Sequence, residues 1–150
     1  MRIRSIHLVL AVAAVWLFAQ PAAAQVFGVR AGASANPDQF YFGVHGDTGP
    51  VVEELHFRPN LEFGVGNDIT LVALNFEFVY PFAIEDTDWS FYPGLGPALN
   101  IVKFNDETSS HGGINFVFGL EHRDGFFTEI KVGAIDSPDF KFGVGYSFKR

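Results

Sequence analysis

The sequence predicts an all-β chain of eight antiparallel strands, and three observations lead to that prediction. Apolar and polar residues alternate with a period of two through nearly the whole chain after residue 24, which is the pattern of strands with two unlike faces. Clusters of Gly, Pro, Asn and Asp interrupt the alternation and indicate turns. The chain also contains 18 Phe and 16 Gly but no Cys, so it is too aromatic to be disordered and has no disulfides to hold it together.

The first 24 residues have the pattern of a secretory signal peptide. Arg2 and Arg4 precede an uninterrupted apolar run over residues 8–19, and Pro21 is followed by three alanines. This run is shorter than the ~20 apolar residues that a membrane-spanning helix needs, so we expect cleavage after Ala24 rather than a retained anchor. The expected organisation is a signal peptide over residues 1–24 and one β-barrel domain over residues 25–150.

The expected strands follow from the alternation in order along the chain. The clearest is the last, where Phe140, Phe142 and Tyr146 fall on one face and Lys141 and Gly143 on the other. Each strand with its turn takes roughly 16 residues, which suits membrane-crossing strands of ~9–11 residues with short connections. The expected strands are 26–34, 39–46, 52–66, 69–82, 89–104, 112–122, 126–135 and 139–149, and the turns between them are Asn36–Asp38, Gly46–Pro50, Gly66–Asp68, Glu85–Asp88, Asn105–Gly112, Arg123–Gly125 and Asp136–Asp139.

Side-chain size decides which face of these strands points inward. The interior of an eight-stranded barrel is just wide enough for ordinary side chains, and the rings on the apolar faces would overfill it. Outward-facing rings would form an oversized apolar patch in water, whereas they suit lipid, where barrel closure also leaves no unpaired strand edge. We therefore predict an up-and-down transmembrane barrel with a lumen lined by glycine and polar groups. The predicted lipid-facing residues are Phe57, Phe63, Phe76, Phe78, Phe116, Phe118, Phe140, Phe142, Tyr146 and Phe148.

Charged residues on the opposite faces are expected to pair inside the lumen. Both signs occur there in similar number, and a buried charge is unfavourable unless it is paired. A network of ion pairs and hydrogen bonds would plug the tube and leave little room for conduction. Its expected members are Arg30, Glu54, Arg58, Glu62, Glu77, Glu121, Glu129, Lys131 and Lys141.

Three segments carry a resemblance to a known family. They are the opening strand Val29–Gly32, the segment Leu55–Gly64 and the closing strand Phe140–Phe148. With the alternation of the whole mature chain, they resemble the small outer-membrane β-barrel family of Gram-negative bacteria, whose members include the transmembrane domain of outer-membrane protein A. The resemblance implies termini in the periplasm, outer-membrane lipid around the barrel, and recognition of the C-terminal strand by the barrel-assembly machinery. Family members usually end on an aromatic residue, whereas Lys149 and Arg150 follow Phe148 here.

Candidates for metal binding or catalysis are few. His45 and His56 could share the lumen face, but no third ligand has a recognisable spacing, so we expect hydrogen-bonded histidines and no metal or cofactor. Tyr92 is close to a strand end, where an interfacial aromatic residue is expected.

Ser109, Ser110 and His111 lie together beside Asp106 and Glu107. These residue types are the components of a Ser-His-acid site, but their spacing matches no hydrolase motif. We expect them to form a solvated polar turn.

The leading hypothesis is a non-enzymatic, integral outer-membrane barrel with a structural role in the envelope. A net charge of −7 disfavours nucleic acid as a partner, because binding to phosphates needs a basic surface. Two alternatives stay open. One is a lipid A-modifying enzyme on the same scaffold that uses the Asn105–His111 segment, and the other is a soluble exported barrel that binds a small apolar ligand, as lipocalins do.

Overall fold

The computed structural model describes residues 26–148, all of whose regular elements are β-strands. The predicted signal peptide with its cleavage site, and Lys149 and Arg150, lie outside the described residues. Between residues 26 and 148, no helix has the length and apolarity needed to cross a membrane. The strands are β1 (Val26–Ala35), β2 (Gln39–Asp47), β3 (Pro50–Val52), β4 (Leu55–Gly66), β5 (Ile69–Val79), β6 (Phe82–Ala83), β7 (Trp89–Phe104), β8 (Glu107–His122), β9 (Phe126–Ile135) and β10 (Phe140–Phe148).

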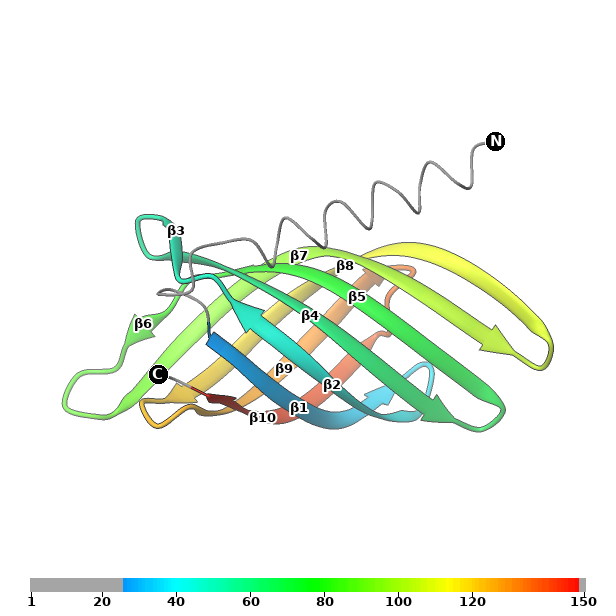
Figure 1. Ribbon diagram of the computed structural model, residues 1–150, viewed down its shortest axis with the longest axis horizontal. Coiled ribbons are helices and arrows are strands. Elements are labelled where there is room, and N and C mark those ends of the chain that lie inside the picture. The colour runs from blue at the N-terminus through cyan, green and yellow to red at the C-terminus, as the bar shows by residue number, and fades with distance from the viewer. Residues whose placement is uncertain (1–25, 149–150) are drawn as a thin grey trace.

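Eight of these strands form a closed antiparallel barrel (Figure 1). β1 pairs with β10 on one side and with β2 on the other, and β2 pairs in turn with β4. The pairings β4–β5, β5–β7, β7–β8, β8–β9 and β9–β10 complete the circle. The short strands β3 and β6 pair with β4 and β7, respectively, and lie at the end of the barrel where β1 begins and β10 ends. The predicted eight-stranded antiparallel barrel is confirmed.

The strand boundaries differ from the expected ones in three places. The expected strand 52–66 is interrupted at Glu53, whose φ of 52° lies in the left-handed region, so the barrel strand begins only at Leu55. The expected strand 69–82 ends at Val79. The expected turn over residues 105–112 is wrong, because the chain reverses at Asn105 and Asp106 and the residues that follow pair with β7.

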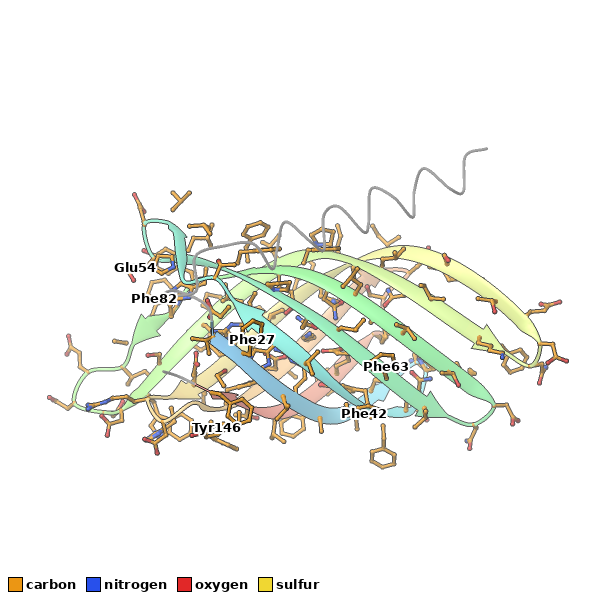
Figure 2. All side chains as sticks on the ribbon, viewed as in Figure 1. Phe27, Phe42, Glu54, Phe63, Phe82 and Tyr146 are labelled. Atoms are coloured by element: carbon orange, nitrogen blue, oxygen red, sulfur yellow. The ribbon has the colours of Figure 1, made fainter. Side chains whose placement is uncertain are left out.

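Side chains alternate between the interior and the exterior along the barrel strands. In Figure 2 the labelled Phe27, Phe42, Phe63 and Tyr146 lie on the outer surface. Strand β10 shows the alternation most simply, since its lysine, one of its glycines and its serine are buried while four of its rings are 41% to 56% exposed. These are Lys141, Gly143 and Ser147 inside, and Phe140, Phe142, Tyr146 and Phe148 outside.

Glycine makes room for the few large rings that do point inward. Tyr92 on β7 is fully buried and pairs with Gly119 on β8. A Cβ at Gly119 would lie 2.1 Å from the Tyr92 ring, closer than any side chain allows. Phe127 on β9 is buried beside Gly145 on β10 in the same way, at 2.3 Å. In this narrow interior, each of these two rings therefore lies opposite a glycine of the neighbouring strand, which has no side chain to collide with it.

Candidate functional site: the ion-pair cluster of the barrel interior

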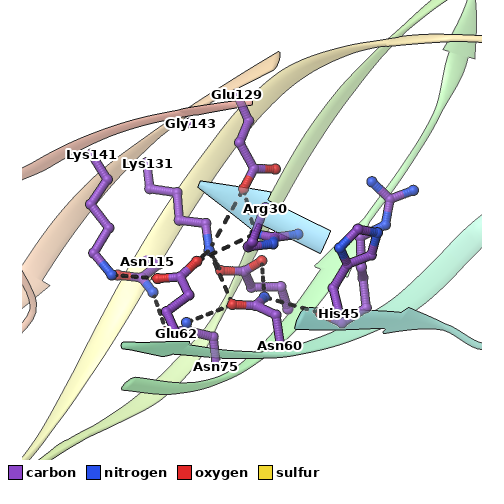
Figure 3. Close-up of polar contacts among 12 residues, drawn as sticks. Arg30, His45, Asn60, Glu62, Asn75, Asn115, Glu129, Lys131, Lys141 and Gly143 are labelled. Atoms are coloured by element: carbon purple, nitrogen blue, oxygen red, sulfur yellow. Dashed lines mark hydrogen bonds and ion pairs between the residues drawn. The ribbon is translucent and has the colours of Figure 1, made fainter. Parts of the chain in front are cut away.

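A cluster of charged side chains from several strands meets around Glu62 inside the barrel (Figure 3). Glu62 projects inward from β4 and is fully buried. It accepts hydrogen bonds from Lys141 Nζ on β10 at 2.6 Å, from Lys131 Nζ on β9 at 2.9 Å and from Arg30 Nη1 on β1 at 3.4 Å. One carboxylate thus connects four strands across the interior.

Two further carboxylates complete this cluster. Glu77 on β5 lies 2.7 Å from Lys131 Nζ, and Glu129 on β9 accepts a hydrogen bond from Arg30 Nη1. The hydroxyl of Tyr92 donates to the other oxygen of Glu129 at 2.8 Å. The side chains of Arg30, Lys131, Lys141, Glu62, Glu77 and Glu129 therefore balance three positive charges with three negative ones, as buried groups require.

An asparagine ladder fixes the orientation of this cluster. Asn115 donates to Asn75 at 2.8 Å, Asn75 donates to Asn60 at 2.7 Å, and Asn60 donates to Glu77 at 2.8 Å. Lys131 Nζ also donates to Asn60 Oδ1 at 3.3 Å. Chains of hydrogen bonds in a low-dielectric interior strengthen one another, so the ladder and the ion pairs form one connected polar interior.

A second charged group lies nearer the end where β3 and β6 project. Arg58 Nη2 donates to Asp47 at 2.8 Å and to Glu121 at 3.2 Å, and its guanidinium lies 4.8 Å from the centre of the Tyr92 ring. His56 Nδ1 lies 2.8 Å from the other oxygen of Asp47. These four charged or polar residues form part of the wall of a cavity of about 470 Å³ that opens at this end of the barrel.

The structure places all but one of the expected lumen residues inside the barrel. Arg30, Arg58, Glu62, Glu77, Glu129, Lys131 and Lys141 are buried there, and Glu121 is mostly covered. The prediction for Glu54 is wrong. Glu54 is exposed in the turn that follows β3, near its label in Figure 2, because the alternation is interrupted before the barrel strand begins at Leu55.

Several interior residues carry no charge and escaped the sequence analysis. Tyr92, expected near a membrane interface, and Phe127 point inward instead. Tyr41 is also buried, below the ammonium of Lys141 at 5.1 Å. The signal that marks each ring is a glycine opposite it on the neighbouring strand: Gly32 and Gly64 for Tyr41, Gly119 for Tyr92, and Gly145 for Phe127.

The two candidate metal-binding histidines have different partners. His45 is buried and its Nε2 lies 2.9 Å from the hydroxyl of Ser147, whereas His56 contacts Asp47. Within residues 26–148, no three His, Asp or Glu side chains are grouped so as to hold a metal ion.

The expected lipid-facing rings all lie on the other face of the wall. They pack against one another along the outside, as Phe57 does with Phe78 at a centroid distance of 5.1 Å and Phe63 with Phe42 at 5.7 Å. Each of them is exposed or half-buried: Phe57, Phe63, Phe76, Phe78, Phe116, Phe118, Phe140, Phe142, Tyr146 and Phe148.

Two solved structures have a similar backbone fold. The crystal structure of Neisserial surface protein A (NspA) matches with a TM-score of 0.63 and 14% sequence identity, over 84% of this chain and 95% of that chain. The N-terminal β-barrel domain of Pseudomonas aeruginosa OprF matches with a TM-score of 0.60 and 12% identity, over 83% of this chain and 96% of that one. Both are eight-stranded outer-membrane barrels. This chain has their fold. No protein-family model and no curated protein sequence matches it.

Proposed function

We propose that this chain is a small integral outer-membrane barrel with a structural role in the envelope, and that its ion-pair cluster closes the lumen. The observation that carries the proposal is the placement of Glu62, which contacts cations from three other strands at the centre of the tube. Side chains that bridge opposite walls stabilise the closed barrel and occupy the path that an ion would take.

The aromatic rings on the outer face of the barrel indicate that lipid surrounds it. Rings that are exposed all around a closed barrel would be unfavourable in water, whereas lipid accommodates them. The fold shared with NspA and the OprF barrel supports an outer-membrane location, with outer-membrane lipid as the partner. The barrel-assembly machinery is the proposed partner of β10 during insertion. The lipocalin-like alternative loses support, because a soluble carrier needs its apolar residues inside.

The location is tested by fractionation. We expect the mature protein in the outer membrane, extracted only by detergent, and migrating faster on a gel before boiling than after, because a closed barrel resists unfolding in detergent. Recovery in the aqueous periplasmic fraction without heat-modifiable mobility would contradict the membrane assignment. The same fractions give the mature N-terminus by mass spectrometry, which is expected at Gln25.

Closure of the lumen is tested by planar-bilayer recording. We expect little steady conductance from the purified protein. The double variant Glu62→Ala, Lys141→Ala removes two bridging side chains of opposite charge and leaves Arg30 beside Glu129 and Lys131 beside Glu77, so that no net charge remains. It should produce channel openings that the parent lacks. The matched control replaces exposed charges, Glu54→Ala with Lys103→Ala, and should conduct no more than the parent. Large, steady channels in the parent protein would contradict a closed lumen. Heat-modifiable mobility of both variants verifies that they fold.

A further inference from the structure

The hairpin of β7 and β8 projects past its neighbours at the end of the barrel opposite β3 and β6 (Figure 1, yellow). β8 pairs with β7 from Glu107 onward, but its pairing with β9 begins only at Gly113. Residues 107–112 therefore have one strand edge without a ladder partner among the described residues. This edge faces the connection between β9 and β10, which begins with Asp136.

Three side chains meet at this edge in the order of a Ser-His-acid site. His111 Nε2 lies 3.1 Å from the hydroxyl of Ser109, and His111 Nδ1 lies 3.9 Å from a carboxylate oxygen of Asp136. Ser109 and His111 are two residues apart on one strand and so share a face, whereas Ser110 points to the opposite face. Of the two serines, Ser109 is therefore the partner of His111.

The backbone holds Asp136 in position. Ile135, directly before it, has a φ of 66° and is 76% exposed. A β-branched residue in the left-handed region is strained, and such strain gathers at functional sites. Asn100 Nδ2 donates to the carbonyl of Asp136 at 3.0 Å and to the Ser137 hydroxyl at 3.3 Å. The turn is thus tied to β7, the strand that also pairs with Ser109 and His111.

The same face of the hairpin offers an apolar surface beside Ser109. Val102 is the cross-strand partner of Ser109, and Phe104, half-exposed, is the partner of Glu107. Directly paired residues of an antiparallel sheet have neighbouring side chains on one face. An aliphatic chain lying on Val102 and Phe104 would therefore lie beside Ser109.

We propose that Ser109 and His111, positioned by Asp136, hydrolyse carboxylic esters of aliphatic acids. Ser109 Oγ bonds to the carbonyl carbon while its proton passes to His111 Nε2. The bond from that carbon to the alcohol oxygen then breaks, and the alcohol leaves with the proton from Nε2. Water attacks the resulting acyl-serine, gives one proton to His111 and then to Ser109, and releases the carboxylic acid. In an antiparallel pair, alternate N–H groups of a strand point away from its partner, so an N–H of residues 107–112 that points away from β7 would donate to the oxyanion. This activity goes beyond the structural role and does not depend on it.

The test uses the full mature chain refolded in detergent. A fluorophosphonate probe should modify Ser109, as located by peptide mass spectrometry, and p-nitrophenyl butyrate should be hydrolysed. Ser109→Ala and His111→Gln should abolish labelling and lower kcat/KM by at least ~10²-fold. The matched control is Ser110→Ala, on the opposite face of the same hairpin. This variant should leave both the labelling of Ser109 and kcat/KM unchanged. Heat-modifiable mobility verifies that each variant folds.

Asp136 is tested as a positioning residue. Asp136→Asn should lower kcat with little change in KM and alter the pH profile, because the wrong imidazole tautomer is then favoured, and Asp136→Glu should restore part of the rate. A parallel assay with vesicles of phosphatidylethanolamine and lipopolysaccharide identifies the source of the ester: released fatty acid indicates a membrane lipid, and hydrolysis of the soluble ester alone indicates a soluble one. Either supports the proposal. It is overturned if the parent is not labelled, if His111→Gln is labelled equally, or if the label is on Ser110.

Discussion

Replacing Glu62 by alanine should lower the free energy of unfolding by about 3–5 kcal/mol, the usual effect of removing one partner of a buried ion pair. Glu62 is fully buried and contacts Lys141, Lys131 and Arg30. Its loss leaves three cations facing two remaining carboxylates, in an interior where charge is poorly solvated. The measurement is urea unfolding in lipid–detergent mixtures, followed by the fluorescence of Trp89.

The matched control for this variant is Glu54→Ala. Glu54 has the same chemistry but is exposed in a turn, so its replacement should change the free energy of unfolding by less than about 0.5 kcal/mol. The double variant Glu62→Gln, Lys141→Met should be more stable than Glu62→Ala, because removing both members of a pair leaves less uncompensated charge than removing one. Equal unfolding midpoints for Glu62→Ala and Glu54→Ala would show that the cluster contributes nothing to stability.

The alternation of residues was sufficient to predict the fold, because it depends on one local property of a strand. Successive side chains point to opposite faces, so Lys141 and Phe142 can be assigned to different faces without any knowledge of their neighbours. The rule fails where the strand is interrupted. Glu54 was assigned by extending the period through Glu53, whose left-handed backbone breaks it.

The interior rings needed information that a single strand does not carry. Tyr92 and Phe127 fit inside because Gly119 and Gly145 lie opposite them on neighbouring strands. That relation is visible only once the register between strands is known, and register depends on the whole barrel. The same is true of the contact between His111 and Asp136, which joins β8 to the connection after β9.

Replacing Phe118 by arginine should lower the free energy of unfolding in lipid by about 2–4 kcal/mol, the effect of a cation on the lipid face near the middle of the membrane. Phe118 is 43% exposed and pairs with Ile130, near the centre of β9. The control is Phe40→Arg. Phe40 is more exposed but is the second residue of β2, beside the turn after β1. There arginine can reach the polar interface, and the effect should fall to about 0–1 kcal/mol.

This pair of variants distinguishes a membrane barrel from a soluble one by depth rather than by exposure. In a water-soluble barrel both positions would be surface sites, and an exposed arginine would change the stability by about 0.5 kcal/mol or less at either. In a membrane the residue with the smaller exposed fraction should suffer the larger loss, because distance from the interface determines the free energy of burying the guanidinium. Equal, small effects at Phe118 and Phe40 would contradict the assignment of the rings to lipid, even if the barrel itself folds as described.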